Sequence, residues 1–503
     1  MLDIITGDVK ALEQAIEADK HSYDKENAEA AQRYYDYEHD ILSNKIYFMN
    51  DNEQLVEDKY ASNIKIPHPF FTEIVSQSVS TELANGVKLK VEDEEFQVLL
   101  EEYWDEDIQL FLQEMLEGAS IKGKEYAYVR QLPGEMQTSR ISFQVSDSLQ
   151  TFTITDESGD VVGVVRYYTK PMLRDDKQVE VEHAEVWTSE NVTFYLKNKD
   201  NAFIINPDKS PNPRSHILAE QKGEDGKPVL LGKSFGRIPF RKLKNNKKEK
   251  TDLEPIKELI DDYDLMNAFM SNNLQDYSGA IYVTKGYNDD VSKLRMNVRS
   301  KGGINVDEDG AFDMKTYDIP VDGRVKKMEL DKRNIYKFGM AFDSTAISDS
   351  SGSVTNVQIM AGYSLLMMKL SKKEAHLKTL IDWMIELITE DINRRYSAAY
   401  DHRDIEVIIE RETMVNRLEN VQIEKTEAET KQLKLTALLD IAMFLPQEKV
   451  LREICDIVEL DWNEIEAMLL EDVSLPSLQG VGDENGDDEQ VGEGDRSDIP
   501  EGT

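Results

Sequence analysis

The order of patterns between residues 251 and 402 constrains the fold of this chain more than any other feature. A periodic helical segment is followed by a compact β-rich insertion, a second helix, a serine-rich break and one long helix. This order is unusual for the core of an enzyme. We place the five parts at residues 251–280, 281–321, 322–341, 342–356 and 357–403.

The first helix is predicted by apolar residues that recur mostly at steps of three and four. Thr251 and Asp252 are candidate caps at its start, and its polar face, which includes Asp264, suits solvent or a polar subunit contact. The β-rich insertion is expected to begin with a strand and then to form a hairpin, with strands at residues 280–284, 303–306 and 312–317.

The second helix carries three basic residues along one face, namely Lys326, Arg333 and Lys337. The break after it has small polar residues and little apolar content, so we expect a mobile loop there. The candidate functional residues of this loop are Asp343, Ser348, Asp349, Ser351 and Gly352. The long helix is predicted from about residue 357 to 396, which corresponds to roughly 60 Å.

The remaining parts of the chain mix helical and β-rich patterns, which predicts the α+β class. Helices are expected within residues 1–48 and at 69–84, 96–121, 417–444, 446–457 and 461–470. Strands are expected at 126–130, 141–145, 151–155, 161–169, 179–188, 192–196 and 405–410. The final segment, 471–503, has eleven acidic residues against one arginine, and it should be disordered because it cannot repay the entropy of ordering.

The net charge of −39 argues against a sequence-specific DNA-binding surface, which normally presents a basic footprint to phosphates. A channel that passes a duplex without gripping it remains compatible with that charge. Two basic clusters are candidates for DNA or partner contacts, with a simple solvated surface as an interpretation of equal weight. They are Arg241, Lys242, Lys244, Lys247, Lys248 and Lys250 before the first helix, and Arg324, Lys326, Lys327, Lys332, Arg333 and Lys337 on the second.

The whole pattern resembles the portal proteins of long-tailed phages that infect Gram-positive bacteria. Beyond the central segment, short strings look like landmarks of that family: Arg33-Tyr34-Tyr35, His39-Asp40-Ile41-Leu42, residues 63–71, residues 120–126, Gly236-Arg237-Ile238-Pro239-Phe240 and residues 259–264. The resemblance covers roughly residues 30 to 470. One departure lies in the serine-rich loop, where relatives often carry more glycine and this chain has only Gly352.

The resemblance implies an elongated portal subunit. Its parts would be an N-terminal region and wing (1–250), a stem helix (251–280), a clip (281–321), a second stem helix (322–341), a tunnel loop (342–356), a long tunnel helix (357–403), a wing strand (404–416), a helical crown (417–470) and an acidic tail (471–503). Twelve copies would form a ring at one capsid vertex of the virion, after assembly in the host cytoplasm. Double-stranded DNA would pass through the ring, and terminase, scaffold protein, major capsid protein and head-tail connector proteins would be its partners.

The sequence offers no recognisable enzyme or cofactor signature. Gly226 and the run Gly232-Lys233-Ser234 resemble a phosphate-binding loop, but five residues intervene where four are needed. The seven histidines lack paired metal-ligand spacing, and the single cysteine, Cys455, excludes an internal disulfide framework. No apolar run approaches the roughly 20 residues that cross a bilayer, so a membrane role is disfavoured.

Two alternatives from other classes stay open. A packaging-associated nucleic-acid protein, such as a nuclease or ATPase, would need a carboxylate cluster for metal or a true phosphate loop. A structural scaffold without a channel would need coiled-coil heptads, whereas the long helix shows only the stripe of a globular helix.

Overall fold

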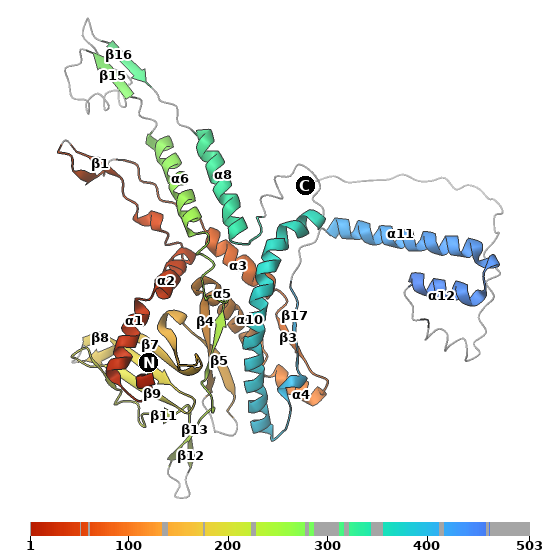
Figure 1. Ribbon diagram of the computed structural model, residues 1–503, viewed down its shortest axis with the longest axis horizontal. Helices are drawn as coiled ribbons and strands as arrows, with labels where there is room; N and C mark the ends of the chain where they lie inside the picture. The colour runs from red at the N-terminus through yellow and green to blue at the C-terminus, as the bar shows by residue number, and fades with distance from the viewer. Residues whose placement is uncertain are drawn as a thin grey trace, which may run out of the picture. The chain divides into compact units, whose positions relative to one another are not determined.

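The computed structural model describes residues 2–50, 52–58, 61–132, 139–174, 177–222, 228–276, 281–285, 311–315, 321–343, 356–411, 417–458 and 462. The chain divides into two compact units, Met1–Val415 and Asn416–Thr503. The larger unit combines helices with antiparallel sheets (Figure 1), which confirms the predicted α+β class.

A six-stranded antiparallel sheet has the order β10-β9-β8-β7-β6, with β11 paired to β9. Helix α1 (Val9–Lys20) packs on it, because Leu12 and Ile16 lie on one helical face and join Ile154 and Val165 in one core. The strands are β6 (Thr151–Thr155), β7 (Val161–Arg174), β8 (Lys177–Trp187), β9 (Asn191–Lys197), β10 (Phe203–Ile205) and β11 (Arg214–Ser215). The four strands expected between residues 151 and 196 are therefore confirmed.

The main core lies around the long helix α10 (Asn356–Tyr396), which has 41 residues and extends about 60 Å. Its predicted apolar stripe is buried, as at Leu377, Ile381 and Ile388. It joins α3 (Phe70–Glu82) and the sheet β14-β4-β5 in one cluster. These strands are β4 (Lys124–Gln131), β5 (Ile141–Ser146) and β14 (Phe240–Lys244), and a further pair is formed by β3 (Val87–Lys90) and β17 (Glu406–Ile409).

Two helices occupy the region where one was expected over residues 96–121. They are α4 (Glu94–Glu101) and α5 (Glu106–Lys122), and the prediction of a single helix was wrong because Asp105 starts a new one. The Asp105 side chain accepts a hydrogen bond from the Ile108 N–H at 3.2 Å, as an N-cap does. The remaining short elements are α2 (Tyr23–Tyr35), β12 (Ile217–Lys222), β13 (Pro228–Lys233), and the 3-10 helices η1 (Leu2–Ile4), η2 (Asp40–Ser43), η3 (Ser148–Gln150) and η4 (His402–Asp404).

The two helices expected on either side of the β-rich insertion form an adjacent pair, α6 (Lys257–Asp276) and α8 (Val321–Phe338). Helix α6 begins at Lys257, so Thr251 and Asp252 do not cap it, which corrects that prediction. Thr251 instead accepts the Glu254 N–H in the preceding turn, at 3.2 Å.

The insertion between α6 and α8 contains a two-stranded antiparallel ribbon of β15 (Ile281–Lys285) and β16 (Ala311–Lys315). The strand predicted at 312–317 corresponds to β16, which pairs with β15, the first strand of the insertion. Residues 303–306, where another strand is predicted, lie outside the described residues.

A second hairpin consists of β1 (Tyr47–Met49) and β2 (Leu55–Glu57). It was not predicted, because helices are expected within residues 1–48 and no strand is expected at 55–57. In Figure 1, β1 stands clear of the other labelled elements of its unit.

The smaller unit contains α11 (Arg417–Ile441), η5 (Ala442–Phe444) and α12 (Gln447–Val458), which confirms two of the three helices expected there. The third, at 461–470, and the acidic tail lie outside the described residues except for Trp462.

Candidate DNA and subunit contact surfaces

The loop that follows α8 is described only at its start. Phe342 is buried, its ring stacks on Tyr363 with centroids 4.1 Å apart, and Gln77 bonds both its backbone N–H and its carbonyl, at 2.8 and 2.9 Å. Asp343 lies 3.9 Å from the Lys332 ammonium. The other four candidate residues, Ser348, Asp349, Ser351 and Gly352, lie outside the described residues. The loop therefore leaves the core from a well-anchored point.

The basic face predicted on α8 points away from α6. Lys326, Arg333 and Lys337 are exposed, whereas Asp331 and Ile335, about half a helical turn away, are buried. Within the described parts of the chain, none of the three exposed cations has an ion-pair partner. Leu330 lies in the same stripe and is 47% exposed. We call Lys326, Leu330, Arg333 and Lys337 the α8 outer stripe.

In the basic cluster before the first helix, three of the six cations, Lys242, Lys244 and Lys250, are in ion pairs with nearby glutamates. The carboxylate of Glu249 lies 2.6 Å from Lys242, 3.1 Å from Lys244 and 3.0 Å from Lys124. Burial alone would raise the pKa of Glu249, but these ammonium groups outweigh burial and lower the pKa to about 2. This leaves Lys247 and Lys248, both exposed in the turn after β14, as the lysines of the cluster that carry no ion pair in the described structure.

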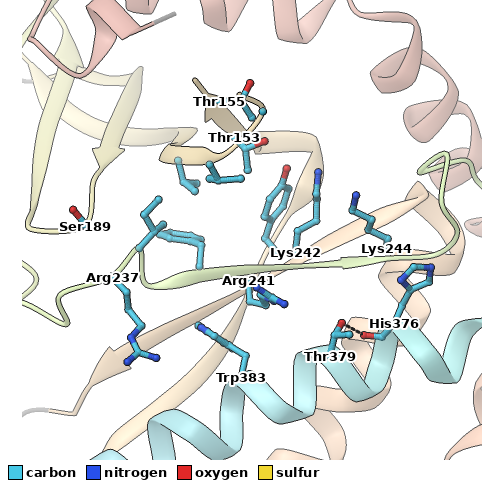
Figure 2. A pocket seen from close by; sticks show the side chains of 16 residues that line it. Thr153, Thr155, Ser189, Arg237, Arg241, Lys242, Lys244, His376, Thr379 and Trp383 are labelled. Atoms are coloured by element: carbon cyan, nitrogen blue, oxygen red, sulfur yellow. Dashed lines mark hydrogen bonds between the residues drawn. The ribbon is translucent and has the colours of Figure 1, made fainter. Parts of the chain in front are cut away.

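A hollow of about 730 Å³ lies between β14, the β6–β7 turn and α10 (Figure 2). Arg241 and Lys242 of β14 and His376 and Trp383 of α10 are among its lining residues. Arg237 lines it too, and its guanidinium is held by Glu386 and Glu390 of α10 at 3.0 and 2.5 Å. One side of the hollow is therefore lined by basic side chains, some of which are in ion pairs. Among the residues lining that side, Arg241 is exposed to solvent.

A buried ionic network fastens α10 to the chain just before α6. The Asp252 carboxylate lies 2.8 Å from both the Lys369 and the Lys373 ammonium, and Lys373 also donates to the Ser120 hydroxyl at 2.6 Å. Burial would raise the pKa of Asp252, but the two cations hold it well below its ordinary value. Burial also lowers the pKa of Lys373 to about 8.

This network was not predicted, although one residue of the sequence indicates it. Lys373 lies in the middle of the apolar stripe of α10, four residues before Leu377, where a lysine needs a buried partner. The prediction of Asp252 as a helix cap gave it a different partner from the two lysines that it contacts.

A second buried network ties α6 to the N-terminal segments. Asp264 accepts hydrogen bonds from the ring nitrogens Nδ1 of His39 and Nδ1 of His68, both at 2.7 Å. The other ring nitrogen of His39 lies 3.2 Å from the backbone oxygen of Tyr34. Both ring nitrogens of His39 therefore face oxygen atoms in the interior of the protein, which fixes the orientation of the ring. The expectation that Asp264 faces solvent or a neighbouring subunit was wrong.

The described residues contain no group of three or more histidine, cysteine, aspartate or glutamate side chains arranged to hold a metal ion. Among the helices that the structure describes, none is both long and apolar enough to span a membrane.

Comparison with known proteins identifies relatives over most of the chain. The portal protein of Bacillus phage SPP1 is 26% identical over 349 residues, which cover 69% of this chain and 66% of that protein. The portal protein of Clostridium phage phiCD119 is 25% identical over 201 residues, which cover 39% of this chain and 43% of that protein. The chain thus spans less than two thirds of the length of either relative.

Among solved structures, a chain from the neck of a native GTA particle, computed with C12 symmetry, is 12% identical with a TM-score of 0.35, covering 78% of this chain and 90% of that one. A model of the family described as "Phage portal protein, SPP1 Gp6-like" matches residues 14–472. The chain therefore belongs to the SPP1 Gp6-like family of phage portal proteins.

Proposed function

We propose that this protein assembles into a homo-oligomeric ring, twelve-fold in the virion, at one vertex of a phage capsid. The ring is the channel through which double-stranded DNA enters during packaging and leaves on infection. It is also the platform on which terminase docks and to which head-tail connector proteins later attach. Scaffold and major capsid proteins surround it during assembly in the host cytoplasm. The role is one of assembly and passage, and it requires no chemistry from this chain.

The observation that carries this proposal is the match of the portal family over residues 14–472, in which the helix pair α6–α8 and the long α10 follow one another in the expected order. In this assignment α6 and α8 are the stem, the β15–β16 ribbon belongs to the clip, and α10 is the tunnel helix. The clip would contact terminase and then the connector proteins.

The charge of the chain supports a conduit that does not grip its cargo. With a net charge of −39 per chain, the ring has an excess of acidic groups that repels phosphate overall, and three lysines around Glu249 are already paired with it. The loop after α8, with Asp343 and Asp349 as its charged residues, would form a weakly repulsive collar around the duplex.

Imaging of the purified protein by negative-stain electron microscopy tests the proposal, together with light scattering across micromolar concentrations. We expect closed rings with a central hole in the absence of nucleotide and nucleic acid. A monomer at every concentration would overturn the proposal, and compact oligomers without a hole would favour a scaffold without a channel.

A further inference from the structure

The β1–β2 hairpin exposes large apolar side chains on both of its faces. Leu55 is 72% exposed and Met49 65%, and Tyr47, Phe48 and Val56 are exposed as well. Cross-strand pairing places Met49 opposite Leu55 and Phe48 opposite Val56, so neither face is polar. A two-stranded hairpin alone in water is at best marginally stable, and clustered exposed apolar groups mark contact sites.

The hairpin is nevertheless held in a defined shape. Its turn is fixed by the Asn50 side chain, which accepts the N–H groups of Asn52 and Gln54 at 3.0 and 2.9 Å. At the open end, Lys45 and Glu57 form an ion pair of 3.2 Å. The surface is therefore preorganised for a partner, which reduces the entropy lost on binding.

The base of the hairpin is fastened to α6. Asn63 donates to the backbone oxygen of Asn44 at 3.0 Å, and the Ile64 N–H donates to the Asn272 side chain at 2.7 Å. The α8 outer stripe, by contrast, faces away from α6. One copy of the chain thus carries the hairpin and the stripe on different sides of the α6–α8 pair.

The two surfaces are complementary in charge and in polarity. The hairpin segment 45–58 has four acidic residues against one lysine, whereas α8 has six basic residues against three acidic ones. Each surface also offers an apolar group, which on the stripe is Leu330. DNA fits the stripe less well, because the exposed Leu330 would be left without an apolar contact.

We infer that the β1–β2 hairpin of one copy docks on the α8 outer stripe of the next copy. Because two different surfaces meet, the contact is head-to-tail, and repetition around a closing rotation produces a ring. The inference rests on the proposed ring and specifies its contact. It also assigns Lys326, Arg333 and Lys337 to subunit recognition and not to DNA.

A photo-crosslinking experiment tests the contact directly. Phe48 is replaced by p-benzoylphenylalanine, labelled and unlabelled chains are mixed and assembled, and the crosslinked peptides are identified by mass spectrometry. We expect a mixed-label crosslink from position 48 to residues 321–338. Crosslinks within a single chain only, or to another part of the second chain, would overturn the inference.

A charge swap provides an independent test. Arg333→Glu with Lys337→Glu, and separately Glu53→Lys, which leaves the Lys45–Glu57 ion pair of the hairpin intact, should each raise the protein concentration needed for ring assembly roughly tenfold, since exposed charge contacts are reversed at every interface. Combining the three changes should restore most of the lost assembly. Lys10→Glu with Lys90→Glu, both exposed positions elsewhere, is the matched control and should change assembly little.

The apolar part is tested by Met49→Ser with Leu55→Ser, against Val98→Ser with Leu110→Ser, which are 61% and 56% exposed at other sites. Only the hairpin variant should weaken assembly.

If the parent chain stays monomeric, the proposed ring and this contact both fail. If the parent forms rings and the swaps leave assembly unchanged but impair DNA packaging, the stripe meets DNA and only the contact fails.

Discussion

Two buried lysines of α10 depend on a single carboxylate, that of Asp252. Replacing Asp252 by Ala leaves Lys369 and Lys373 buried beside each other without a counter-charge, which we expect to cost about 3–5 kcal/mol of unfolding free energy. Denaturant titration against the parent measures this, and Asp404→Asn, at an exposed carboxylate, is the control. Adding Lys373→Met to Asp252→Ala should recover part of the loss. A variant as stable as the parent would show that the lysines find other partners.

The contribution of Glu249 to the free energy of unfolding is predicted to depend on pH. Its folded pKa of about 2 is below the ordinary 4.5, so its contribution to stability is complete above about pH 4.5 and is lost as the pH falls toward 2. Glu249→Gln should therefore lower the unfolding free energy by about 1–2 kcal/mol at pH 7, discounted for partial solvent screening. The difference from the parent should shrink toward pH 2. Equal differences at pH 7 and pH 3 in parallel melting curves would refute this origin of the effect.

At the scale of elements, the loop between α8 and α10 connects two helices that are firmly held in the core, through Phe342 at one end and Leu366 and Leu370 at the other. Asp349→Lys would place one added cation per subunit around the channel. An attraction of ~1 kcal/mol or less between each added lysine and a DNA phosphate, summed over all subunits, would substantially slow the movement of DNA through the channel. We expect normal rings but impaired packaging or retention of DNA, with the defect eased by salt.

A reconstituted packaging assay at low and high salt measures this effect. Asp200→Lys, the same charge change in an exposed turn of the larger unit, is the control. If Asp349→Lys packages DNA as well as the parent at low salt, the loop does not line the DNA path.

At the scale of the whole molecule, the family match ends at residue 472, where the acidic and glycine-rich tail begins. Truncation after Glu471 should leave folding and ring assembly intact, because the tail has few apolar residues to bury. Circular dichroism and size-exclusion chromatography compare the two forms. Loss of soluble ring on truncation would assign the tail a structural role.

The features that depend on local pattern could be predicted from the amino-acid sequence. The long helix α10, the strands between residues 151 and 196 and the basic face of α8 follow from periodicities of 3.6 and 2, which each segment carries independently of its neighbours. The family could also be read from the order and spacing of short strings.

Which polar groups contact one another depends on the folded structure and could not be predicted. Asp252 and Lys373 are 121 residues apart, and Asp264 and His39 are 225 apart, so no local pattern relates them. The sequence alone does not show whether a charged side chain is exposed to water or paired with a buried partner. The exposure of the β1–β2 hairpin could not be predicted either, because a short apolar segment has the same sequence pattern whether it is buried or exposed to solvent. Burial is set by what the rest of the chain places against each residue, and that is a property of the fold.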